Sequence, residues 1–97
     1  MSENKNISYP LIDNQKENQY EFHIGEYIAK IVYIKTQNKI LLTHTEVPKQ
    51  LGGQGIGASL LEKVLEDIQK KDLTLEPVCS FVVAYIQKHP HWRKLVL

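Results

Sequence analysis

Four glycines between two regular segments are the sequence feature with the clearest chemical use. They are Gly52, Gly53, Gly55 and Gly57, and a strongly patterned helix follows them. Glycine permits positive φ angles and lets a ligand approach the main chain closely. The first N–H groups of a helix have no acceptor within that helix, and the helix dipole favours an anion there. The spacing therefore predicts a phosphate or pyrophosphate site on this turn.

Two common nucleotide-binding motifs do not fit the turn. A dinucleotide-binding fingerprint needs Gly-x-Gly-x-x-Gly after a central parallel strand, whereas residues 53–57 read Gly-x-Gly-x-Gly after an antiparallel meander. A P-loop needs a Gly-Lys-Ser/Thr sequence, which does not follow. A purely structural role, in which the glycines only build a tight strand-to-helix turn, stays open.

Three further residues carry side chains suited to nucleophilic or acid–base chemistry. Cys79 stands between an expected strand and an expected helix, where a helix N-terminus favours the thiolate. It could act as a nucleophile, or pack as a small buried hydrophobic residue. His44 and Glu46 alternate on one expected strand and so point to the same face. Either could serve as a general base, and a solvated or structural role is the alternative.

The C-terminal stretch is basic, since residues 88–94 include Lys88, Arg93 and Lys94. His89 and His91 are two residues apart, but no carboxylate or thiol stands near them, and we expect no metal site. We interpret the stretch as a capping segment that packs on the domain through Trp92, Leu95 and Val96.

The elements that must position these residues predict an α+β domain. Residues 1–19 are polar and read as a loose tail before a domain over residues 20–97. The order expected is three antiparallel strands, a helix, a strand parallel to the third, and a second helix. The strands are expected at residues 20–24, 27–35, 40–47 and 73–76, with one helix starting at Ile56 and another running from Ser80, as N-cap, to about His89.

Composition narrows the classes of partner. The formal net charge is +1, so no global field exists to hold nucleic acid or an anionic membrane. The single cysteine cannot form an internal disulfide, and the sequence shows neither a secretory signal nor a membrane-spanning run. We expect a cytoplasmic protein that binds no nucleic acid and no membrane.

The segment around the glycines resembles the coenzyme-A-binding motif of GNAT-type N-acetyltransferases. Val47-Pro48 is followed by Leu51-Gly52-Gly53-Gln54-Gly55-Ile56-Gly57 and by Leu60-Leu61. In that superfamily the pattern is Gln/Arg-x-x-Gly-x-Gly/Ala, the amides of the turn hold the pyrophosphate, and the preceding strand bulges to pair with the pantetheine arm. The resemblance implies acetyl-CoA or coenzyme A as the ligand, held by Val47, Gly52, Gly53, Gln54, Gly55, Ile56 and Gly57.

Two registers of the motif fit. The first uses Gln50, Gly53 and Gly55, and the second uses Gly52, Gly55 and Gly57. We favour the second, because Ile56 and Leu60 then enter the core. Gly52 stands there in place of the usual Gln or Arg, which leaves the phosphate contact to the backbone amides.

Further motifs narrow the resemblance to minimal, single-domain GNAT-like proteins over roughly residues 20–95. They are His44-Thr45-Glu46-Val47-Pro48, Pro77-Val78-Cys79-Ser80-Phe81, Tyr85-Ile86 and His89-Pro90. This resemblance implies a truncated GNAT fold with little acceptor pocket, and catalysis by the cysteine. It implies for Tyr85 the protonation of a leaving thiolate, although packing is the alternative. The bulge expected in the strand would lie two residues beyond the pair formed by His44 and Glu46. Lys88 could meet the 3′-phosphate of coenzyme A.

The sequence therefore predicts a protein that binds acetyl-CoA and transfers acetyl to an unidentified amine. The transfer would pass from coenzyme A to Cys79 and then to the amine. A non-catalytic acyl-CoA-binding module, or a protein-interaction module that binds no cofactor, is the alternative.

Overall fold

Alternating buried side chains build the central sheet from Gln19 onward. The computed structural model describes residues 9–96. Strands β2 (Gln19–Ile24), β3 (Tyr27–Lys35) and β4 (Lys39–Glu46) form an antiparallel meander. One face of this meander enters the core through Tyr20, Phe22, Ala29, Ile31, Tyr33, Ile40 and Leu42. This alternation is the period-2 pattern of a half-buried strand, and the three predicted strands are confirmed.

The full sheet has five strands in the order β1-β2-β3-β4-β5. Strand β5 (Thr74–Pro77) pairs with β4 in parallel, as the sequence predicted from the crossover through a helix. Strand β1 (Ile12–Asn14) was not predicted, so the expected count of four strands is corrected to five.

Strand β1 lies within the segment that the sequence predicted to be a loose tail. Asp13 anchors it, because its carboxylate accepts hydrogen bonds from the Tyr33 hydroxyl at 2.6 Å and from Lys71 Nζ at 3.1 Å. Short polar strands have weak local propensity and depend on such long-range partners. The tail prediction is therefore wrong for the strand, and residues 1–8 lie outside the described residues.

A bulge interrupts the β3–β4 ladder. Val32 pairs with His44 whereas Tyr33 pairs with Leu42, which leaves Thr43 as the extra residue. The Thr43 hydroxyl donates a 3.3 Å hydrogen bond to the Val32 carbonyl. The bulge therefore precedes His44, and the sequence placed it too late, after Glu46.

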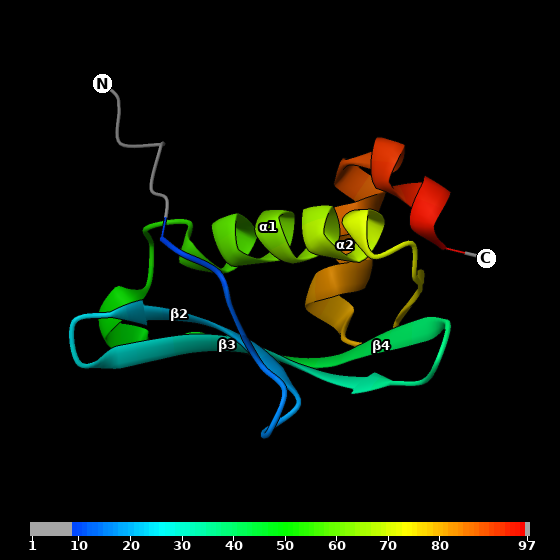
Figure 1. Cartoon of the computed structure of the whole chain (residues 1–97). Helices are drawn as coiled ribbons and strands as arrows, with labels where there is room; N and C mark the ends of the chain where they lie inside the picture. The colour runs from blue at the N-terminus through cyan, green and yellow to red at the C-terminus, as the bar shows by residue number, and fades with distance from the viewer. Residues whose placement is uncertain (1–8, 97) are drawn as a thin grey trace.

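Two helices cover one face of the sheet (Figure 1). Helix α1 (Ile56–Lys70) buries the predicted apolar stripe, which includes Ile56 and Leu60 as the favoured register of the glycine motif requires. Helix α2 (Ser80–Lys88) has Cys79 as its N-cap, one residue before the predicted Ser80. The 3₁₀ segment η3 (Pro90–Leu95) then packs back through Trp92 and Leu95, and Val96 after it also packs on the core, as expected for a capping segment.

The outer side of α1 is not wholly open to water. Asp67 accepts a 2.7 Å hydrogen bond from the Tyr20 hydroxyl, and Lys63 Nζ donates to the Tyr9 carbonyl at 2.9 Å. The chain before β2 thus lies along this helix. Among the described residues, no helix is both long and apolar enough to cross a lipid bilayer.

Candidate functional site

The glycine turn connects the 3₁₀ segment η2 (Lys49–Leu51) to the first residue of α1. Gly53 and Gly55 adopt φ angles of +76° and +73°, a left-handed conformation that glycine takes without strain. Gly55 is the N-cap of α1 and is exposed, and its carbonyl accepts a hydrogen bond from the Ser59 amide. The sequence prediction that glycines shape this turn is therefore correct in conformation.

The amides of the turn are available to a ligand. Within residues 9–96 no backbone carbonyl accepts a hydrogen bond from the amides of residues 53–57. A Cβ built on Gly53 or Gly55 meets no atom within 4 Å, so the space in front of both is open. These amides stand at the positive end of a 15-residue helix, which suits a phosphate group.

Gly57 serves packing rather than turn geometry. A Cβ at this position would lie 3.3 Å from the ring of Phe81 and 3.5 Å from Cγ2 of Val47. The absence of a side chain therefore lets α1 approach both α2 and the residue after β4. Val47, which the sequence assigned to the cofactor site, lies against this same junction.

A shallow groove lies where Ala58 of α1 faces the exposed side of α2. It has a volume of about 320 Å³ and is lined mainly by apolar groups. Phe81 is 38% exposed at this place, and Lys88 supplies a positive charge at the other end of the lining. The lining residues are Ala58, Phe81, Ala84, Tyr85, Lys88 and His89.

Strands β4 and β5 separate just before α2, the helix that lines this groove. Their last pair is Leu42 with Pro77, and the amides of Val78 and Cys79 both donate to the Leu42 carbonyl. The chain then turns away into α2, so the edge of β4 beyond Leu42 has no β5 partner. This split is the place at which Cys79 begins α2.

Cys79 faces Thr45 across the split, with Sγ 3.5 Å from Oγ1. Partial burial opposes ionisation of the thiol. Hydrogen bonds from the Thr45 side chain and from the backbone of Val82 and Phe81 outweigh it and hold the pKa of Cys79 below its ordinary value. The environment therefore favours the thiolate, the form in which cysteine is a nucleophile.

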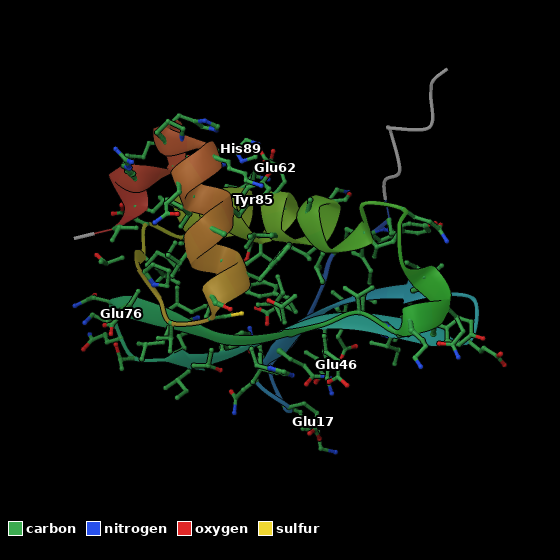
Figure 2. The ribbon with its side chains drawn as sticks, turned by 180° about the vertical axis from the view of Figure 1, so that it is seen from behind. Glu17, Glu46, Glu62, Glu76, Tyr85 and His89 are labelled. Carbon is green, nitrogen blue, oxygen red and sulfur yellow. The ribbon has the colours of Figure 1, made fainter. Side chains whose placement is uncertain are left out.

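His44 and Glu46 lie on the other side of the sheet. They pair with Val32 and Lys30, whereas Thr45 pairs with the buried Ile31. Figure 2 shows Glu46 on the face opposite the helices. His44 Nε2 and Glu46 Oε1 are 3.7 Å apart and more than half exposed. The prediction that the two share a face is confirmed, but that face is not the one that carries Cys79.

Tyr85 is part of a polar cluster on the helices, where Figure 2 shows it beside Glu62 and His89. Its hydroxyl donates a 2.5 Å hydrogen bond to Glu62 Oε1, and Trp92 Nε1 donates to the same oxygen at 3.1 Å. The His89 ring stacks on Tyr85 with centroids 4.1 Å apart. Burial and the bond to Glu62 raise the pKa of Tyr85, which makes its phenol a weaker proton donor.

The structure joins some of the predicted site residues and separates others. The glycine turn, Val47 and Cys79 lie around the junction of α1, α2 and the end of β4, whereas His44 and Glu46 do not. Sequence reasoning missed Thr45 and Phe81 as parts of this site. No group of three or more His, Cys, Asp or Glu side chains within residues 9–96 could hold a metal ion.

The family model described as GCN5-related N-acetyl-transferase matches residues 19–95. The NMR solution structure of a GCN5-like candidate N-acetyltransferase from Staphylococcus aureus is 29% identical in sequence, with a TM-score of 0.69, and the match covers 91% of this chain and 87% of that one. No curated protein matches the chain.

Proposed function

Because this chain belongs to the GCN5-related N-acetyl-transferase family, we propose that it binds acetyl-CoA and transfers the acetyl group to an amine. The observation that carries the proposal is the open glycine turn at the start of α1, whose amides have no backbone acceptor within residues 9–96. A pyrophosphate group fits the chemistry of that turn.

Other groups of the chain suit the 3′-phosphate and the pantetheine arm of the coenzyme. The amides of residues 53–57 hold the pyrophosphate, and the exposed Lys88 meets the 3′-phosphate at the far end of the groove. The β4 edge beyond Leu42 offers backbone groups to the amides of the pantetheine arm. A ligand that follows this path brings its thioester to the split at which Cys79 lies.

Cys79 acts in the proposal as the nucleophile. Its thiolate attacks the acetyl carbonyl, an S–C bond forms on Cys79, and the bond from that carbonyl to the coenzyme sulfur breaks. An amine then attacks the acetyl-Cys79 thioester, which forms the amide and returns the cysteine. The lowered pKa of Cys79 supports this role, since it increases the fraction of thiolate at neutral pH.

His44 and Glu46 enter the proposal only on the acceptor side. Both are exposed on the outer face of the sheet, where either can accept a proton from an incoming ammonium group through water. They do not touch Cys79, so their removal is expected to slow transfer to the amine more than acetylation of the cysteine.

The experiment that tests the nucleophile is intact-mass analysis after incubation with acetyl-CoA. We expect the wild-type chain to gain one acetyl group that is released by hydroxylamine, and Cys79→Ser to gain no such labile group. Peptide mapping then assigns the modified residue. Stoichiometric labelling of lysines alone, with Cys79 unmodified, would contradict the proposed route.

A non-catalytic acyl-CoA-binding module is the second candidate. The separation of His44 and Glu46 from Cys79 favours it, because neither of these two predicted bases then stands beside the thiol. This candidate predicts that Cys79→Ala binds acetyl-CoA as tightly as the wild type and that no acetyl-Cys79 forms.

A further inference from the structure

Thr45 and Cys79 meet at the split although 34 residues separate them in the chain. Thr45 is the last helix-facing residue of β4, and Cys79 is the N-cap of α2. Their contact is thus a direct link between the sheet and the start of the helix that carries the proposed nucleophile.

The bulge at Thr43 is the feature that aims Thr45 at the cysteine. Ile40 and Leu42 point to the helices, so unbroken alternation would bring His44 and Glu46 to that side. The extra residue inverts the remainder of β4, and Thr45 pairs instead with the buried Ile31. A neutral hydroxyl therefore faces Cys79 where an imidazole or a carboxylate would otherwise stand.

Charged side chains on the elements around Cys79 pair with residues other than Cys79. On the outer face, Lys30 of β3 lies 3.6 Å from Glu46, and Glu76 of β5 bonds Lys39 of β4 at 2.9 Å. On the helices, Tyr85 of α2 bonds Glu62 of α1. Among the described residues, the groups that hydrogen-bond Cys79 are the Thr45 hydroxyl, the Thr45 backbone and the backbone of the first turn of α2.

We propose that Thr45 is the positioning residue for Cys79: its hydroxyl orients Sγ at the split and donates a hydrogen bond to the thiolate. This inference rests on the proposed function, because it assigns a role to Thr45 in the attack by Cys79. In the resting thiol the hydrogen bond runs from Sγ–H to Oγ1, and it reverses when the thiol ionises.

The thiol proton leaves to water, and the thiolate forms the S–C bond to the acetyl carbonyl. The coenzyme leaves as a thiolate and takes a proton from water. Thr45 keeps its own proton throughout, so it acts through Cys79 and does not touch the acetyl group as a reactant.

The test is the pH dependence of Cys79 alkylation by iodoacetamide, measured on the full chain without acetyl-CoA. We expect Thr45→Val to raise the midpoint by about one pH unit, which is a roughly tenfold fall in rate below the midpoint. Thr45→Ser keeps the hydroxyl and is expected to stay within about 0.3 units of the wild type. Thr36→Val is the matched control, because it removes an exposed threonine hydroxyl that bonds a backbone carbonyl, that of Lys39, away from the bulge and from Cys79.

An unchanged midpoint in Thr45→Val, or an equal rise in Thr36→Val, would overturn the inference. Thermal melting checks that each variant is folded, and Thr45→Ala repeats the measurement if the valine variant does not fold. A separate titration with acetyl-CoA distinguishes the two proposals. If the wild type binds acetyl-CoA but the alkylation midpoint of Thr45→Val is unchanged, only the role of Thr45 is contradicted. If the wild type does not bind acetyl-CoA, the proposed function is contradicted.

Discussion

The phenolic oxygen of Tyr85 lies 2.5 Å from Oε1 of Glu62 and joins α2 to α1 beside the proposed coenzyme groove. The indole of Trp92 donates to the same carboxylate oxygen, so one residue of α1 holds both α2 and the C-terminal 3₁₀ segment. The geometry of the groove therefore depends on this carboxylate.

Tyr85→Phe is expected to lower the free energy of unfolding by about 1–2 kcal/mol, because it removes a hydrogen bond to a charged group. Urea denaturation measures the change. Tyr27→Phe is the matched control, since the described residues provide no hydrogen bond to the Tyr27 hydroxyl. Equal losses in both variants would show that the bond to Glu62 contributes no stability.

Glu21 is the most buried acidic residue in the described part of the chain, at 4% exposure, and should make stability depend on pH. Burial opposes its ionisation, but bonds from His23, Gln19 and Asn14 hold the pKa of Glu21 below its ordinary value. Such a carboxylate stabilises the fold above its unfolded pKa and loses that contribution as pH falls through the folded pKa.

Glu21→Gln is accordingly expected to cost about 1–3 kcal/mol at pH 7 and progressively less toward pH 3. Glu76→Gln is the control, because its pair with Lys39 is half exposed and contributes little. Denaturant titrations across this pH range measure both. A constant difference between wild type and Glu21→Gln at every pH would contradict the assignment.

Lys88 should distinguish coenzyme A from its 3′-dephospho form. We expect Lys88→Ala to weaken binding of coenzyme A about three- to tenfold and to leave the dephospho form nearly unchanged, because an exposed charge pair contributes about 1 kcal/mol. Lys16→Ala, in the turn after β1, is the matched control. Equal weakening of both ligands by Lys88→Ala would place the 3′-phosphate elsewhere.

Local patterns in the sequence predicted most of the fold. The apolar period of α1 and the alternation along β2 and β3 are strong local signals, and all three elements form as predicted. Strand β1 escaped prediction because Asp13 gains its partners, Tyr33 and Lys71, only in the folded chain. A short polar strand of this kind has no periodic signal of its own.

The site was predictable in its glycine turn and less so in its acid–base residues. Gly53 and Gly55 reveal the turn by residue type, because positive φ favours glycine. The bulge at Thr43 leaves no such mark, since any residue can occupy it. Alternation alone therefore gave the shared face of His44 and Glu46 correctly and concealed Thr45 as the residue that meets Cys79.

Binding of acetyl-CoA to the glycine turn is the central claim, and isothermal titration calorimetry tests it most directly. Gly55→Val and Gly25→Val impose the same left-handed strain, since Gly25 has φ +60° and equally open surroundings in the β2–β3 hairpin. We expect saturable binding in the wild type and in Gly25→Val, and none in Gly55→Val. No heat from the wild type at millimolar acetyl-CoA, or equal binding in Gly55→Val, would contradict the claim.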